Sequence, residues 1–259
     1  MTGLGAVGLA ATAWTPGAEE ELPVEAGPTQ RAEPTSRAEP VSGPSPSTSG
    51  PAVTPGTPAS PGSAPIPSKI ALPESGPGTF TRASGGSAKV GTGRTLRYRV
   101  DVEKGLELSA TDVAEEVERI LGDPRGWTAD RRSAFQRVSG GATDFVVKVA
   151  TPETVDKICG QYGLETRGEV NCSVDENVMV NLKRWVLATP VYEKDVTAYR
   201  ALIINHEVGH FLGHGHVGCP GRGKPAPAMM QQIKGLKGCV PNVWPYDAKG
   251  RLVTGPAVP

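Results

Sequence analysis

The sequence predicts one α/β (α+β) domain over residues 79–259, a twisted mixed sheet with packed helices, preceded by a disordered N-terminal region. Two observations support this expectation. Residues 16–78 hold 15 of the 25 prolines and no Phe, Trp or Tyr, so they cannot bury the apolar surface that offsets chain entropy. The remaining stretch of about 180 residues suffices for one well-formed core, and it alternates strand-like with helix-like patterns.

Charge and hydropathy argue against two classes of protein. The chain has 27 Lys and Arg and 27 Asp and Glu, and the positive charges are scattered rather than gathered into a stripe. We therefore expect no nucleic-acid partner. No run of about 20 apolar residues occurs, which argues against a polytopic membrane protein.

The start of the chain permits two interpretations. Residues 1–15 contain a short apolar run with a small-x-small pattern at Ala11–Ala13, but no Lys or Arg opens it. They are either the remnant of a signal peptide or membrane anchor, or a plain disordered end. Residues 16–78 then form a disordered Pro/Ser/Thr/Gly-rich linker. It is either a stalk that holds an exported domain away from a membrane or cell wall, or a linker of no specific role. We expect a secreted or extracytoplasmic protein.

The predicted domain begins with a strand and a helix. Arg94–Val102 alternates apolar and polar residues and is rich in β-formers, which predicts a strand. Ser109 is placed to cap a helix whose apolar residues recur at helical spacing as far as Leu121. Gly122 and Pro124 are expected to end this helix.

Four further patterns follow along the chain. Ala134–Val138 and Asp144–Ala150 flank Gly140–Gly141, which predicts a β-hairpin. Thr151–Pro152 opens a short helix, with Pro at its first position. Asn177–Val186 is rich in β-formers and predicts another strand.

The longest helical pattern, Val196–Gly213, carries the residues that point to chemistry. All four histidines of the chain lie between residues 206 and 216. His206 and His210 are four residues apart, so both imidazoles lie on one helix face and can bind one zinc ion at about 2.0–2.1 Å. Glu207 lies beside the same site and can reach a water at the metal without being a ligand.

The third ligand depends on how the helix ends. If Gly213 adopts a left-handed conformation, it turns the chain and brings His216 to the metal. If the helix ran on, His214 would be the ligand, although Gly213 and Gly215 disfavour this. We expect one Zn²⁺ per chain with an open position for water, as in catalytic sites. The alternatives to a catalytic zinc site are a metal ion with a structural or regulatory role and a chance pattern that binds no metal.

The pattern His-Glu-x-x-His-x-x-Gly-x-x-His over residues 206–216 resembles the zinc signature of the metzincin metallopeptidases. The resemblance implies a tight turn carrying a Met beneath the metal. Met229 fits this turn slightly better than Met230, and an ordinary buried Met is the alternative. The resemblance also implies that a peptide lies antiparallel to an edge strand above the site helix, and Val178–Leu182 is the expected strand.

Further segments are similar to those of an exported actinobacterial domain family without an assigned function. They are Cys219–Gly221, Pro225–Pro227, Met230–Gln232 and Pro241–Pro245. The chain departs from some metzincins at Gln231 and Gln232, where those proteins have a Tyr that binds the metal or donates to the transition state. In this chain that role is therefore either absent or played by another residue.

Four cysteines allow three disulfide pairings. The short loops favour Cys159–Cys172 and Cys219–Cys239, and the even count fits an oxidising compartment. Four buried thiols in a cytosolic protein are the alternative. No Cys-x-x-Cys occurs, so a cysteine-type zinc site is not expected.

The leading hypothesis is a zinc metallopeptidase, a metzincin-like endopeptidase that hydrolyses peptide bonds with a zinc-activated water and Glu207 as general base. Its partner would be a peptide or protein substrate, and a monomer is expected. One alternative is an exported zinc-stabilised binding or scaffold domain with little turnover. Another is a hydrolase of cell-wall peptide amides. Glu207 argues against a scaffold, because a structural site does not need that carboxylate.

Overall fold

The computed structural model describes residues 72–258, so the predicted signal remnant and most of the predicted linker lie outside the described residues. The domain begins earlier than the expected residue 79. Leu72 packs against the main hydrophobic core, and the Glu74 carbonyl accepts a hydrogen bond from the Glu153 N–H at 3.0 Å. Residues 72–78 therefore belong to the folded part of the chain.

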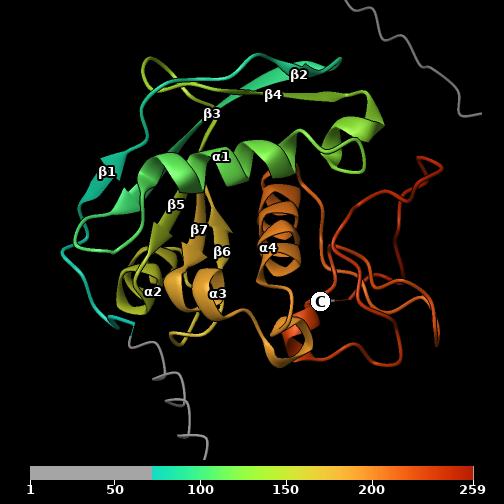
Figure 1. Ribbon diagram of the computed structural model, residues 1–259. Coiled ribbons are helices and arrows are strands. Elements are labelled where there is room, and N and C mark those ends of the chain that lie inside the picture. The colour runs from blue at the N-terminus through green and yellow to red at the C-terminus, as the bar shows by residue number, and fades with distance from the viewer. Residues whose placement is uncertain (1–71, 259) are drawn as a thin grey trace, which may run out of the picture. The chain divides into compact units, whose positions relative to one another are not determined.

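Within these residues the strands form one seven-stranded sheet (Figure 1). The strands are β1 (Phe80–Arg82), β2 (Val90–Gly91), β3 (Arg94–Glu103), β4 (Ser133–Arg137), β5 (Phe145–Ala150), β6 (Cys172–Val174) and β7 (Asn177–Asn181). Their order is β2-β4-β3-β5-β7-β6, and β1 pairs with the second half of β3. Strands β4, β3, β5 and β7 run parallel, whereas β1, β2 and β6 are antiparallel to their neighbours. The predicted mixed α/β sheet is confirmed.

Four α-helices pack on this sheet. They are α1 (Ala110–Leu121), α2 (Pro152–Gly160), α3 (Leu182–Leu187) and α4 (Val196–Phe211), with short 3-10 helices η1 (Trp127–Asp130), η2 (Pro190–Tyr192) and η3 (Gln232–Lys234). Helices α1, α3 and α4 share the main core with the sheet, whereas α2 packs with Met179 and Ala150 in a separate cluster. Because Met179 alternates with Val178 and Val180 of the main core, α2 covers the opposite face of the sheet.

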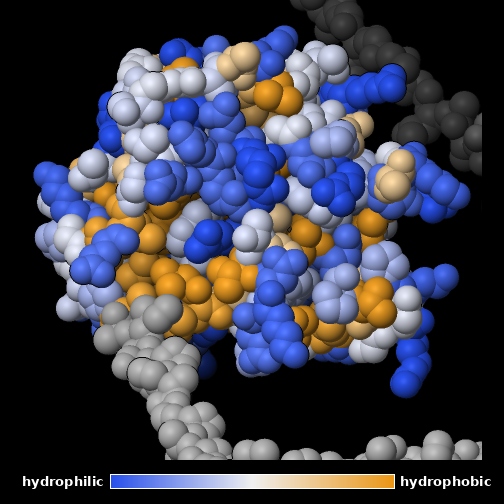
Figure 2. Space-filling model, in the orientation of Figure 1, coloured by the Kyte–Doolittle hydropathy of each residue, from blue (hydrophilic) through white to orange (hydrophobic). Residues whose placement is uncertain are grey.

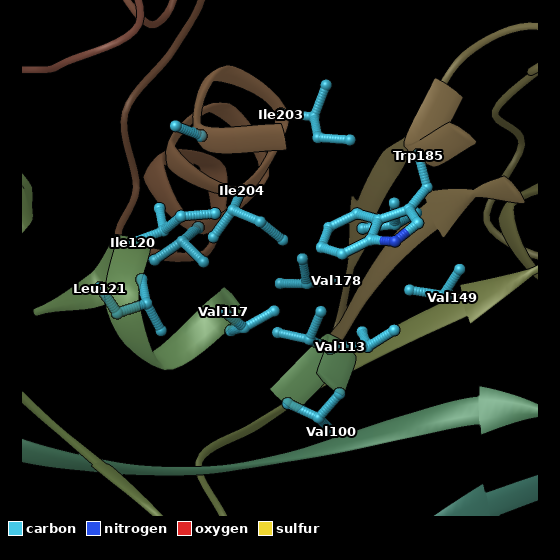
Figure 3. Close-up of a cluster of buried hydrophobic side chains, with 14 of the residues drawn as sticks. Val100, Val113, Val117, Ile120, Leu121, Val149, Val178, Trp185, Ile203 and Ile204 are labelled. Carbon is cyan, nitrogen blue, oxygen red and sulfur yellow. The ribbon is translucent and has the colours of Figure 1, made fainter. Parts of the chain in front are cut away.

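The main core lies between α1, α4 and the sheet (Figure 3). Val117 and Ile120 of α1 lie close to Ile204 of α4 and Val178 of β7, and all four side chains are fully buried. Burial of an aliphatic side chain contributes about 1.5–3 kcal/mol to stability. Above the core, the outward face of α1 is hydrophilic, as Figure 2 shows.

The predicted start of α1 is confirmed. The Ser109 hydroxyl accepts a hydrogen bond from the Asp112 N–H at 3.2 Å, and the helix ends at Leu121 with Gly122 as its cap. The predicted start of α2 is also confirmed, with Pro152 at its first position.

The predicted β-hairpin around Gly140 is wrong. Strands β4 and β5 both form, but each runs parallel to β3, on opposite sides of it. Arg137 at the end of β4 and Phe145 at the start of β5 are both register partners of Tyr98. The chain therefore crosses β3 at Tyr98 and continues in the same direction, where a hairpin would have reversed it.

The predicted strand Asn177–Val186 is half wrong. Strand β7 stops at Asn181, whose side chain accepts a hydrogen bond from the Lys183 N–H at 2.9 Å and caps α3. The last residues of the predicted strand are therefore helical. Asn is a preferred helix-capping residue, and this capping outweighs the β-propensity of Trp185 and Val186.

A buried carboxylate joins the start of the domain to the sheet. Glu103 at the end of β3 is 1% exposed, and it accepts hydrogen bonds from the N–H groups of Gly78 and Thr151 at 2.7 and 2.8 Å. The hydroxyls of Thr151 and Thr154 donate to it at 2.9 and 2.7 Å. Burial acts to raise the pKa of Glu103, but these hydrogen bonds outweigh burial and hold the pKa below its usual value.

After α4 the chain is irregular, and this segment, orange to red in Figure 1, lies along one side of α4. Val217, Met229 and Tyr246 pack from it against the main core. No helix among residues 72–258 is long and apolar enough to cross a membrane.

Candidate metal centre

Helix α4 positions two of the histidines. Its first turn is capped by Asp195, whose carboxylate accepts a hydrogen bond from the Ala198 N–H at 2.8 Å. The helix ends at Phe211, and Gly213 has a φ of 89°, in the left-handed region that favours glycine. The predicted turn at Gly213 is present, and it sends the chain back toward the face that carries His206 and His210.

Three imidazoles meet at this turn. The Nε2 atom of His210 lies 3.2 Å from Nε2 of His206 and 3.1 Å from Nε2 of His216. Ligands bound tetrahedrally at 2.0–2.1 Å from one zinc ion lie about 3.3 Å apart. Both distances from His210 are close to this spacing, and ligand atoms of all three histidines lie within 4.8 Å of one another, so this group could hold one metal ion.

Hydrogen bonds on the far side of the rings indicate why a cation fits. The Nδ1 atom of His206 lies 2.8 Å from the Ala228 carbonyl, and Nδ1 of His210 lies 2.9 Å from the His214 carbonyl. A carbonyl only accepts, so each Nδ1 carries the proton and each Nε2 presents a lone pair. Two lone pairs that face each other at 3.2 Å repel, and a cation between them removes the repulsion.

The surroundings keep the rings neutral. Burial, with a smaller effect of neighbouring His210, lowers the pKa of His206 to about 3. Burial also lowers the pKa values of His210 and His216. Neutral imidazole is the form that binds a metal.

His214 does not join the cluster. Its ring stacks on Trp127 with 4.4 Å between ring centroids and 16° between planes. Its contribution to the site is the backbone carbonyl that orients His210. The geometry favours His216 over His214 as the third ligand.

Glu207 is buried in the same place. Its residue is 5% exposed, and burial raises the pKa of its carboxyl to about 8. Glu207 lines the cleft, and within residues 72–258 no hydrogen bond to its carboxyl oxygens is found, so these oxygens remain available to a ligand.

The histidines and Glu207 open into a cleft of about 520 Å³. The floor is one stripe of α4 that includes Tyr199, Leu202 and Ile203. One wall is formed by residues 164–166 and 170–173, which include β6, and the other by Met230–Ile233.

The prediction of which strand forms the sheet edge beside the cleft is wrong. The first four residues of Val178–Leu182 belong to β7, which lies between β5 and β6 and is therefore not an edge strand, and Leu182 begins α3. Strand β6 is the edge strand, and Cys172 and Ser173 of β6 line the cleft. A tight turn at Asp175, with a φ of 50°, folds β6 back onto β7.

The two methionines after the site take different positions. Met229 packs in the main core, and its Sδ lies 2.3 Å from where a Cβ on Gly209 would be. Met230 lines the cleft and packs with Cys239. Because the Ala228 carbonyl orients His206, the turn at Met229 lies directly against α4.

The two glutamines that follow differ in role. Gln232 is 3% exposed, accepts a hydrogen bond from the Tyr192 hydroxyl at 2.7 Å, and donates to the carbonyls of Pro227 and Asn242. It lines the cleft, but these hydrogen bonds tie its amide group to the turn. Gln231 lines the cleft and accepts a hydrogen bond from Lys234 at 2.9 Å.

Both expected disulfides are present. Cys159 is bonded to Cys172 and Cys219 to Cys239, across 13 and 20 residues. Loops of this length contribute about 3 kcal/mol each when they are closed. Two disulfides fit an extracytoplasmic protein.

Sequence reasoning missed two features of the site. The carbonyls of Ala228 and His214 orient the histidine rings, and backbone acceptors have no sequence signature. Strand β6 was missed because it is only three residues long. The signal that could have found it is the short turn at Asp175–Glu176 between two apolar runs.

Comparisons with known proteins place the chain in a family without assigning it an activity. No curated protein and no solved structure matches it. A family model described as "Protein of unknown function (DUF3152)" matches residues 66–247, which is well over half of the chain. The protein therefore belongs to the DUF3152 family.

Proposed function

We propose that the protein is a zinc-dependent metallopeptidase in which His206, His210 and His216 hold the metal and Glu207 is the general base. The observation that supports this most strongly is the meeting of a three-imidazole cation site and an unpaired buried carboxylate in one open cleft. A structural zinc site is closed by four protein ligands and needs neither a cleft nor a carboxylate. The metzincin-like spacing of the ligands agrees with this proposal.

The chemistry divides between the metal and Glu207. A zinc ion held by the three imidazoles would supply Lewis acidity, which polarises a carbonyl and lowers the pKa of water. The charge of such an ion would also lower the pKa of Glu207 from the value of about 8 that burial gives it, and so favour the carboxylate. As a carboxylate, Glu207 would take the proton from the attacking water and deliver it to the leaving amine. The carbonyls of Ala228 and His214 would keep the two helical imidazoles in the ligand tautomer throughout.

The cleft suits an extended peptide. Strand β6 presents its outer edge beside the cleft, since its inner edge pairs with β7. A peptide that adds to this edge gains backbone hydrogen bonds with little demand on its sequence. The apolar floor at Leu202 and Ile203 suits one apolar side chain of the substrate.

The test compares the wild-type chain with Glu207→Gln on an unstructured protein, with and without a chelator. The substitution keeps the size of the side chain and removes the proton acceptor. We expect Glu207→Gln to retain zinc and lose about 10²–10⁴-fold in turnover. Glu115→Gln, on the exposed side of α1, is the matched control and should cleave as the wild type does.

Three results would count against the proposal. A zinc-loaded wild type that cleaves neither proteins nor cross-linked cell-wall peptides would favour a scaffold. Cleavage by Glu207→Gln at the wild-type rate would remove Glu207 as the base. Activity that survives complete removal of the metal would exclude a metallopeptidase.

A further inference from the structure

The end of the described chain pairs with the segment that carries His216. The Val258 N–H donates to the His216 carbonyl at 3.1 Å, and the Gly218 N–H donates to the Pro256 carbonyl at 2.7 Å. The pairing is antiparallel. Residues 255–258 thus lie beside the third histidine through one isolated antiparallel β-bridge, beyond residue 247, where the family match ends. We refer to these four residues as the bridging strand.

This strand is packed closely. A Cβ on Gly255 would lie 2.0 Å from the Gly218 carbonyl oxygen and 3.3 Å from the backbone nitrogen of Pro220. Backbone atoms cannot rotate away as the end of a side chain can, so only glycine fits here. Side-chain carbons of Pro256 and Val258 in turn lie 3.5 Å from where a Cβ on Gly218 would be.

His216 depends on such neighbours more than the other two ligands do. His206 and His210 lie on α4, and backbone carbonyls anchor their rings. His216 lies in irregular chain, and no hydrogen bond to its Nδ1 is found within the described part of the protein. Its segment is held on one side by the Met229 carbonyl, which accepts from the Val217 N–H at 3.2 Å, and on the other side by residues 255–258.

The geometry points to residues 255–258 as a positioning strand for the third metal ligand. Pairing of this strand with the His216 segment and binding of the metal are coupled. Such coupling is reciprocal, so a strand that holds His216 in place is itself held more firmly when His216 binds the metal. The inference rests on the metal site of the proposed function and is independent of whether the chain cleaves peptides.

The test uses the whole chain with Zn²⁺ or Co²⁺ as the probe. Gly255→Ala cannot keep its contact with Gly218, and a chain that stops after Thr254 lacks the strand altogether. Loss of groups that orient metal ligands weakens affinity about 10–100-fold, and we expect both variants to lose zinc to a chelator faster by a similar factor. The visible spectrum of bound Co²⁺, which reports ligand geometry, should change as well. Gly140→Ala, with open space around its Cβ, is the control.

Hydrogen exchange supplies a second measurement on the wild type. The amides of Gly218 and Val258 should exchange more slowly with zinc bound than without it. The proposal is overturned if the shortened chain keeps zinc and the Co²⁺ spectrum of the wild type. It is also overturned if zinc does not change the exchange rates of those two amides. Neither result would contradict the metal site itself. A wild type that binds no zinc overturns both. If Gly255→Ala fails to fold, the shortened chain and the exchange measurement decide.

Discussion

Replacing Gly209 by Ala tests how closely α4 is packed on the turn at Met229. Gly209 lies between the two helical histidines, in the interior of α4. A Cβ at this position would lie 2.3 Å from Sδ of Met229 and 2.7 Å from Cζ2 of Trp127. Carbon atoms in contact normally lie about 3.5–4.0 Å apart, so both of these groups, or the helix itself, must move by about 1 Å.

Two effects of opposite sign decide the magnitude. Ala in place of Gly favours a helix interior by about 1 kcal/mol. Added volume in a packed core costs about 1–3 kcal/mol. Trp127 cannot relax easily, because it is 1% exposed and its indole N–H donates to the Asn205 carbonyl at 2.8 Å. We expect the higher cost and a net loss of about 2 kcal/mol, or about 4–8 °C in Tm for a domain of this size.

Thermal and denaturant unfolding of the metal-free chain measure this directly. The matched control is Gly160→Ala at the end of α2, where nothing lies within 4 Å of the added Cβ. That variant should be as stable as the wild type or slightly more stable. A Gly209→Ala chain with wild-type stability would show that the helix and the Met229 turn are packed more loosely than these contacts indicate, and it would refute the reasoning.

Two other predictions concern the ligands and the buried carboxylate. His216→Ala should lose zinc on dialysis against a chelator, whereas His214→Ala should keep it because its ring stacks on Trp127. Elemental analysis measures both, and the reverse result would exchange the two assignments. Glu103→Gln should lower the free energy of unfolding at neutral pH by about 2–4 kcal/mol, because an amide NH₂ cannot accept from the N–H and hydroxyl of Thr151. The advantage of the wild type is complete above the ordinary glutamate pKa of about 4.3, and it is lost as the pH falls through the lowered pKa of folded Glu103. Urea unfolding across this pH range checks it, and a deficit that does not change with pH would contradict it.

Local patterns predicted the parts of the fold that local forces decide. The cap at Ser109 and the apolar spacing up to Leu121 identified α1, and the clustering of histidines identified the three imidazoles that meet at the end of α4 and could hold a metal ion. The short spacing of the cysteines likewise identified both disulfides.

The predictions that were wrong depend on contacts between distant parts of the chain. Nothing near Gly140 shows that β3 lies between β4 and β5, because strand order depends on which strands share a core. For the same reason, the sequence did not show that β6, and not the expected β7, forms the edge of the sheet beside the cleft. The pairing of Val258 with His216 joins residues 42 positions apart through backbone atoms alone, which leaves no pattern in side chains.

The placement of the disulfides has a consequence for when the cleft becomes complete. One disulfide includes Cys172 in the β6 wall, and the other includes Cys239, which packs on Met230 of the opposite wall. The floor, α4, carries neither. In a newly made, still reduced chain, the helix can form with its two histidines while both walls lack their cross-links. Oxidation then cross-links each wall to a neighbouring part of the chain, β6 to α2 through Cys159 and the Met230 segment through Cys219, which restricts the conformations open to each wall.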